Sequence, residues 1–280
     1  MEKRLFHIGI VGLGLIGGSL AKALDKYTSH VLYGYDQDAQ ALELAGEMID
    51  GKLDNKLLSQ CDILFLALYP QAAVQYVLEH MEFFKPGCLI ADLCGVKRYL
   101  MERLAAPCQA HGFYYFGCHP MAGRDMWGYS ASDADLFQGA SMLLAPMEGA
   151  SQEDAALLSD LFLEIGFGRV EKTTPEKHDS MIAFTSQLAH VVSSAYIKSP
   201  RALEHDGFSA GSYKDLTRVA KLNPQMWTEL FLENGDMLVR EIDEIILHLT
   251  EYREAILDND ADRLYDLLDT GRKIKEGLGQ

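Results

Sequence analysis

Short, β-branched apolar runs alternate with longer helical stretches in the first half of the chain. We predict strands at Leu5–Val11, Val31–Tyr35, Ile63–Leu68, Cys88–Leu93, Phe113–Gly117 and Ser141–Ala145. We predict helices between them at Leu15–Asp25, Gln71–Phe84 and Val96–Ala110. The run Ile63–Leu68 is apolar at every position, which is typical of a strand buried on both faces of a parallel sheet. This alternation predicts an α/β domain built on a doubly wound, mostly parallel sheet.

The pattern becomes helical near Pro175. Two stretches, Glu176–Ser199 and Pro224–Asp258, have helical composition, and a final helix follows them. In the second stretch, a heptad-like spacing of three and four positions joins Ile242, Ile245, Leu249, Tyr252 and Ile256. Such a stripe needs a partner surface, because large exposed apolar patches are rare on monomers. We therefore predict two domains: an α/β domain over residues 1–172, and an all-α domain over residues 173–280 that forms a homodimer.

The chain is strongly acidic, and this narrows the partners that it can have. Its 280 residues carry 25 Lys and Arg against 41 Asp and Glu, a net charge of −16. Such a surface repels phosphates and anionic lipid, so we expect neither nucleic acid nor a membrane as partner. The five cysteines include no Cys-x-x-Cys pair. We therefore expect no disulfide framework, no bound metal and a reducing, cytoplasmic location.

The segment Gly12-Leu13-Gly14-Leu15-Ile16-Gly17 lies between the first predicted strand and the first predicted helix. In this context the glycine pattern is typical of a dinucleotide-binding Rossmann domain. The first glycine allows a tight turn, the second lets the backbone approach a pyrophosphate, and the third lets the helix pack on the strand. The phosphate would bind at the helix N-terminus. We therefore expect cofactor contacts from Gly12, Gly14, Leu15, Ile16 and Gly17.

Asp36 follows the second predicted strand and has the position of a ribose-binding carboxylate. It would repel the 2′-phosphate of NADP, and the next residues, Gln37 and Asp38, supply no cation. The cofactor predicted from this position is NAD. The alternative is that Asp36 is the N-cap of a helix at Ala39–Leu44.

Two further positions are candidates for substrate chemistry. His119 follows a predicted strand, and the carboxyl ends of parallel strands face the ligand cleft, so its imidazole could accept a proton. Arg218 and Lys214 are four residues apart and would share a helix face, where two cations could hold an anion. A core histidine and a solvated cation pair are the alternatives. His178 and His190 are twelve residues apart, so on an α-helix their faces would differ by about 120°.

Together these residues resemble the prephenate dehydrogenase family, which includes arogenate dehydrogenases. The resemblance runs from about Leu5 to about Gly271. Its motifs are Gly12–Gly18, Gly117-Cys118-His119-Pro120-Met121-Ala122-Gly123, His178-Asp179, Ser186-Gln187-Leu188-Ala189-His190, and Arg218–Asn234 with Pro224 and Trp227.

The resemblance implies a Rossmann domain that binds NAD(P) and a helical domain that forms an intertwined dimer. It implies NAD-dependent oxidative decarboxylation of prephenate to 4-hydroxyphenylpyruvate in tyrosine biosynthesis. His119 would accept the proton of the ring hydroxyl, Arg218 would hold the side-chain carboxylate, and Lys214, His190 and Trp227 would line the substrate pocket. The alternative substrate is arogenate, which would give tyrosine directly.

Two positions depart from the family pattern. Gly95, which we expect to lie beside the cofactor, stands where the family usually has a serine that helps to hold the catalytic histidine. Another group, such as Cys94, a water or a backbone amide, would then have to orient His119, or the geometry of the site would differ. Gln187 stands where many members have a histidine. The rival interpretations are another Rossmann-plus-helical oxidoreductase, such as a pyrroline-carboxylate reductase or a 3-hydroxyacid dehydrogenase, and a nucleotide-sensing protein without catalysis.

Overall fold

The computed structural model describes residues 4–124 and 126–279. The chain forms two compact units, one that runs to Asn234 and one that begins at Gly235. The domain boundary predicted at 172/173 lies within the first unit and stays a prediction. In the part of the chain that the structure describes, no helix is both long and apolar enough to span a lipid bilayer.

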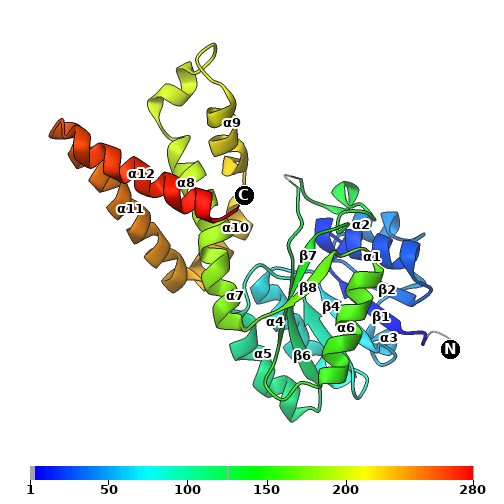
Figure 1. The fold of residues 1–280 in the computed structure, drawn as a ribbon. Helices are drawn as coiled ribbons and strands as arrows, with labels where there is room; N and C mark the ends of the chain where they lie inside the picture. Colours follow the sequence, from blue (N-terminus) through cyan, green and yellow to red (C-terminus); the bar gives the residue numbers. More distant parts are fainter. Residues whose placement is uncertain (1–3, 125, 280) are drawn as a thin grey trace. The chain divides into compact units, whose positions relative to one another are not determined.

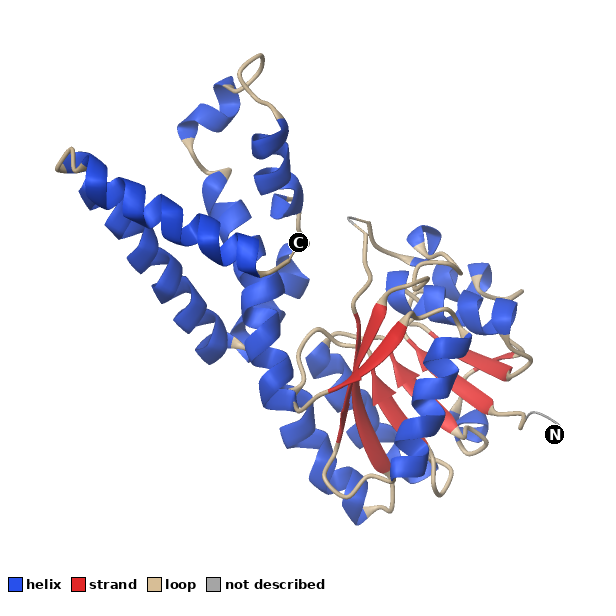
Figure 2. Cartoon of the chain, viewed as in Figure 1, coloured by secondary structure: helices blue, strands red, loops and turns tan. Residues whose placement is uncertain are grey.

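An eight-stranded sheet organises the described part of the first unit (Figure 1, Figure 2). Its strands are β1 His7–Val11, β2 Val31–Tyr35, β3 Gly51–Lys52, β4 Ile63–Leu66, β5 Leu89–Asp92, β6 Tyr114–Pro120, β7 Ser141–Pro146 and β8 Arg169–Lys172. Their order is β3-β2-β1-β4-β5-β6-β7-β8. Strands β1 to β6 are parallel, β7 is antiparallel to β6, and β8 is parallel to β7. The order 3-2-1-4-5-6 is that of the Rossmann fold, with its topological switch point between β1 and β4. The predicted α/β class is confirmed.

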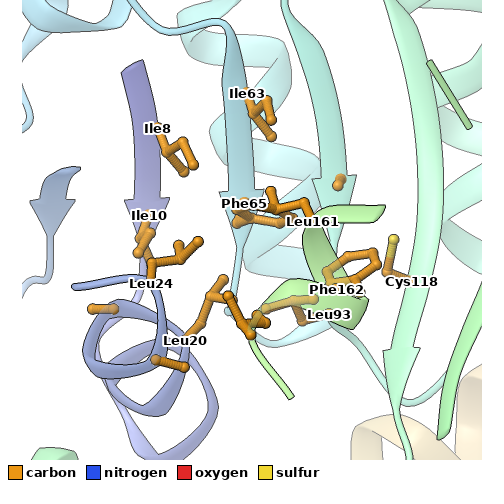
Figure 3. Close-up of a cluster of buried hydrophobic side chains, with 14 of the residues drawn as sticks. Ile8, Ile10, Leu20, Leu24, Ile63, Phe65, Leu93, Cys118, Leu161 and Phe162 are labelled. Carbon is orange, nitrogen blue, oxygen red and sulfur yellow. The ribbon is translucent and has the colours of Figure 1, made fainter. Parts of the chain in front are cut away.

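Helices cover both faces of this sheet. On one face α1 (Leu15–Tyr27), α2 (Ala39–Leu44) and α6 (Gln152–Glu164) bury apolar side chains against the strands. Figure 3 shows part of this core, in which Leu24 of α1 lies beside Ile10 of β1 and Leu161 of α6 lies beside Phe65 of β4. The ring centroids of Phe65 and Phe162 of α6 are 5.8 Å apart. On the other face lie α3 (Asn55–Leu58), α4 (Pro70–His80) and α5 (Arg98–Ala110). All five cysteines are free and buried.

The rest of the first unit is helical. Its elements are α7 Pro175–Ile182, a π-helix η3 at Ala183–Leu188, α8 Ala189–Tyr196, the 3-10 turn η4 Pro200–Glu204, α9 Gly211–Thr217, the 3-10 turn η5 Arg218–Ala220 and α10 Pro224–Glu233. The stretch that the sequence showed as helical from 224 to 258 is divided at Asn234, where α10 ends and the next helix begins.

The second unit is a pair of helices, α11 (Gly235–Leu257) and α12 (Ala261–Gly277). The Tyr252 hydroxyl donates to the Leu267 carbonyl at 3.3 Å, and Arg263 pairs with Glu254 at 3.1 Å. Both helices carry exposed apolar side chains, among them Ile246, Leu249, Ile256, Tyr265, Leu268 and Ile274. The predicted stripe is therefore only partly covered within the chain.

Candidate active site

The glycine loop after β1 leaves the N-terminus of α1 open. Gly12 has a φ of +89°, and a Cβ there would lie 2.4 Å from the Ala67 carbonyl oxygen. A Cβ at Gly17 would lie 1.8 Å from the Gly12 carbonyl oxygen, so helix and loop approach each other closely. A Cβ at Gly14 would meet no atom within 4 Å, and no side chain caps the first turn of α1. Gly12 and Gly17 are thus required by the fold, whereas Gly14 faces open space beside free N–H groups, where an anion could bind.

Asp36 follows β2 and supports this loop. One carboxylate oxygen accepts from the Leu13 N–H at 2.6 Å, and the other accepts from the Asp38 N–H at 2.8 Å. The alternative role as a helix cap is wrong, because Asp38 is the N-cap of α2 and accepts from the Gln40 N–H. A carboxylate has about four acceptor positions, so Asp36 keeps capacity for ribose hydroxyls.

Three side chains form a hydrogen-bonded chain at the carboxyl end of β6. His119 Nδ1 lies 2.9 Å from His178 Nε2, and His178 Nδ1 lies 2.7 Å from Asp179 Oδ1. His119 belongs to β6, whereas His178 and Asp179 belong to α7. Asp179 and His178 are buried, and His119 is partly accessible.

Burial and hydrogen bonds determine the charge states of His119, His178 and Asp179. Burial is the main reason why the pKa of His119 lies well below its ordinary value, and His178 and Lys97 act in the same direction. Burial also lowers the pKa of His178, although the hydrogen bond to Asp179 opposes it. Burial alone would raise the pKa of Asp179, but hydrogen bonds from His178 and from the Arg98 N–H hold it below its ordinary value. At neutral pH two neutral imidazoles therefore stand in series on one carboxylate.

This charge state decides where each proton lies. The Asp179 carboxylate only accepts, so His178 Nδ1 carries a hydrogen and, in the neutral ring, Nε2 accepts. His119 Nδ1 must then be the donor to His178. The remaining nitrogen of His119, Nε2, is left with a lone pair, as a general base requires.

Asp179 also joins α7 to the start of α5. Its carboxylate accepts from the Lys97 N–H at 2.8 Å and the Arg98 N–H at 2.9 Å, and a negative charge is favourable at a helix N-terminus. Beneath this contact the fully buried Lys97 ammonium pairs with Asp92, which also accepts from the Tyr115 hydroxyl. The hydrogen bonds from His119 through His178 to Asp179 are therefore supported by a buried ion pair and its hydrogen bonds.

His190 and Trp227 form a second cluster. Their rings stack with centroids 3.8 Å apart and planes inclined by 29°. His190 Nδ1 lies 3.0 Å from the Ser186 carbonyl oxygen, which can only accept, so Nδ1 carries a hydrogen. Both residues lie where the helical elements α8 and α10 meet.

The prediction that His178 and His190 face directions about 120° apart is wrong. The helix between them contains the π-helix Ala183–Leu188, and a π turn takes one residue more than an α turn. The rotation about the helix axis from His178 to His190 then equals that of eleven α-helical residues, about 1,100°, which is three full turns plus about 20°. The two histidines therefore lie on nearly the same face.

Lys214 and Arg218 are exposed, one at α9 and the other at the start of η5. Helix α8, which carries His190, packs against both α9 and η5. Among the described residues neither cation forms an ion pair, and neither is bonded to His119. Their role in holding a carboxylate stays a prediction.

Gly95 lies in the turn between β5 and α5. A Cβ there would lie 3.4 Å from both methyl groups of Leu230 on α10. Another group does orient His119, as expected, and it is His178, whose Nε2 lies 2.9 Å from His119 Nδ1. Cys94 does not have this role, because its Sγ points to the Leu68 carbonyl at 3.3 Å. The adjacent pair His178-Asp179 was visible in the sequence, but nothing local marked its partner in β6.

Within the described residues, no group of three or more His, Cys, Asp or Glu side chains is arranged to hold a metal ion. The strand order, the glycine loop and Asp36 together define a Rossmann-type dinucleotide-binding protein. Residues 20–171 match the family model "Prephenate dehydrogenase, nucleotide-binding domain", and residues 174–270 match "Prephenate dehydrogenase, dimerization domain". The chain belongs to the prephenate dehydrogenase family, as its motifs predicted.

Relatives and solved structures agree with this assignment. The chain is 32% identical to cyclohexadienyl dehydrogenase of Zymomonas mobilis, over 97% of this chain and 96% of the relative. It is 27% identical to prephenate dehydrogenase of Bacillus subtilis, over 96% of this chain and 75% of the relative. The structure matches prephenate dehydrogenase from Aquifex aeolicus in complex with hydroxyphenyl propionate and NAD+ with a TM-score of 0.87 and 25% identity, covering 99% and 100% of the two chains. It matches Synechocystis arogenate dehydrogenase with a TM-score of 0.81 and 26% identity, covering 97% and 99%.

Proposed function

We propose that this protein is an NAD-dependent prephenate dehydrogenase of tyrosine biosynthesis. It would convert prephenate to 4-hydroxyphenylpyruvate and CO₂ and reduce NAD to NADH. The observation that carries this proposal is the chain from Asp179 through His178 to His119, which leaves His119 Nε2 as a proton acceptor at the carboxyl edge of a Rossmann sheet. Relatives named prephenate and cyclohexadienyl dehydrogenase support the choice of substrate.

The residues present fit a dinucleotide. Gly14 leaves space for the pyrophosphate at the open N-terminus of α1, and Asp36 stands at the end of β2 for the ribose hydroxyls. The related structure with NAD+ bound supports NAD, and the carboxylate of Asp36 disfavours the 2′-phosphate of NADP. The chemistry that NAD supplies when bound is the acceptance of a hydride.

His119 would act on the ring hydroxyl of the substrate. Its neutral Nε2 accepts a hydrogen bond from the hydroxyl, and takes the proton as the hydride leaves the same ring carbon. CO₂ then leaves, and the electron pair of the bond between its carbon and the ring stays in the ring, which becomes aromatic. The phenolate oxygen formed in this way takes the proton back from His119. The imidazolium formed in between is stabilised through His178 by the negative charge of Asp179.

The helical elements would hold the other end of the substrate. In this proposal Arg218 forms two parallel hydrogen bonds to the side-chain carboxylate, a geometry that the planar guanidinium provides and the ammonium group of a lysine does not. Lys214, His190 and Trp227 complete the pocket. The π turn supports this arrangement, because it directs His190 to the same helix face as His178.

A homodimer is part of the proposal. The match of residues 174–270 to the dimerization domain of the family supports it. So do the exposed apolar side chains on α11 and α12, which need a partner surface. Sedimentation of the intact protein tests this, and a monomer that persists at assay concentration would contradict it.

The direct test is the formation of NADH from purified protein, measured with prephenate and with arogenate, and with NAD and with NADP. We expect turnover of prephenate with NAD. A kcat/KM for NADP equal to that for NAD would contradict the role of Asp36. Arogenate is a second candidate substrate, which the likeness to Synechocystis arogenate dehydrogenase supports.

A further inference from the structure

A buried amide connects the π turn to α10. Gln187 is 1% exposed, and its Nε2 donates to the Leu230 carbonyl at 3.1 Å. Its Oε1 accepts from Asn234 Nδ2 at 2.8 Å. Because the Leu230 carbonyl can only accept, this contact fixes which way the amide points. Gln187 thus uses one donor and one acceptor, both toward the end of α10.

The residues that form these hydrogen bonds lie close along their helices to both members of the His190–Trp227 stack. Gln187 lies three residues before His190 on one helix, and its acceptor Leu230 lies three residues after Trp227 on the other. The same π turn offers the Ser186 carbonyl to the His190 ring at 3.0 Å. The turn therefore fixes the direction of His190, while Gln187 fixes the helix that carries Trp227.

The catalytic end is held by different bonds. Asp179 is bonded to the Lys97 and Arg98 N–H groups, and His178 and His119 follow from Asp179. Asn234 also donates to the Asp179 carbonyl at 2.9 Å and accepts from Arg98 at 3.0 Å. Without Gln187, Asn234 would keep both of these contacts, so the base would keep its support.

From this geometry we propose that Gln187 is a positioning residue for substrate binding, whose amide sets the His190–Trp227 stack at the correct place relative to His119. The proposal rests on the proposed function, in which this stack lines the substrate pocket. Gln187 itself contacts neither His119 nor Trp227 through a hydrogen bond of its side chain.

The test compares Gln187→Leu with Gln187→His. Leucine removes the donor and the acceptor, so we expect the KM for prephenate to rise about tenfold or more, with kcat within about threefold and the KM for NAD unchanged. A neutral imidazole has one donor and one acceptor, so Gln187→His should restore the KM at neutral pH. The Gln187→His variant should lose this recovery of the KM at acidic pH, because the protonated ring has no acceptor for Asn234. A KM within about threefold of wild type in Gln187→Leu would overturn the proposal, as would a Gln187→His variant as impaired as Gln187→Leu at every pH.

A second measurement does not depend on turnover. Trp127 and Trp227 are the two tryptophans of the chain, so in a Trp127→Phe background the emission reports Trp227 alone. We expect Gln187→Leu to shift this emission, and Gln187→His to leave it near the parent; an unshifted emission in Gln187→Leu overturns the proposal. If the parent protein oxidises neither prephenate nor arogenate, the proposed function fails while the emission still tests the positioning.

Should Gln187→Leu not fold, Gln187→Glu takes its place. Its carboxylate accepts from Asn234 but meets the Leu230 carbonyl without a proton to donate. We expect the same rise in KM and the same emission shift, both reversed as the pH falls and the carboxyl group becomes a donor. The absence of both effects in Gln187→Glu would overturn the proposal.

Discussion

The role of His178 can be tested with the variant His178→Leu. In the native protein His178 Nε2 accepts from His119 Nδ1 at 2.9 Å, and this bond selects the tautomer with an available lone pair on Nε2. Leucine leaves the buried Nδ1–H of His119 without an acceptor, which costs roughly 1–3 kcal/mol. Because this cost falls on the active tautomer, kcat should drop about 5- to 150-fold, since each 1.36 kcal/mol is a factor of ten.

The matched control is His178→Gln. Its side-chain oxygen can accept from His119, and its NH₂ group can donate to Asp179, so the direction of both bonds is kept. We expect it to recover most of the lost kcat, with the KM for NAD unchanged in both variants. We expect both variants to fold, because Asp179 keeps its bonds to the start of α5. Circular dichroism and thermal melting check this. A kcat of His178→Leu within threefold of wild type would refute the argument from tautomers.

Three further predictions concern the base, the anion clamp and a buried carboxylate. His119→Asn should lower kcat by about 10²–10⁴ with NAD affinity intact; because burial lowers the pKa of His119, wild-type kcat/KM should stay level until the pH is well below the ordinary histidine value. Arg218→Ala should raise the KM for prephenate by about 10²–10⁴, from the loss of two charge-assisted bonds worth about 1.5–3 kcal/mol each, and a change below threefold would assign the clamp elsewhere. Burial and the Glu229 carboxylate raise the pKa of Glu233 from 4.5 to about 7. The folded state therefore binds the proton of this carboxyl group more tightly than the unfolded state does, so the stability falls as the pH rises from 4.5 to about 7. Glu233→Gln should therefore raise the Tm at about pH 8 and leave it unchanged at about pH 5, whereas the exposed control Glu244→Gln should show no such difference.

The Rossmann domain could be predicted from local sequence patterns. The strand Val31–Tyr35 has the predicted bounds, and the other predicted strands were found within a few residues, because a strand in the middle of a parallel sheet is apolar along its whole length. Strands β3 and β8 were missed. The first has two residues, and the second, Arg-Val-Glu-Lys, lies at the sheet edge with mostly exposed side chains. Neither leaves an apolar run to recognise.

The motifs that determined the family are also local. The glycine loop and Asp36 act through backbone geometry over a few residues, and the motif around His119 could be recognised from its order along the chain. What the sequence could not determine was the partner of His119. His178 lies 59 residues away, and no periodicity relates the two positions.

The register of the helical elements could be read only from the folded chain. An α-helix places His178 and His190 on different faces, and the extra residue of one π turn brings them nearly into line. A π turn has no strong sequence pattern, because it is stabilised by contacts to other elements, here the bonds of Gln187 to Leu230 and Asn234. Hydrogen bonds between segments far apart in the chain leave no local periodicity, so the orientation of the catalytic base and of the binding residues appears only once the chain is folded.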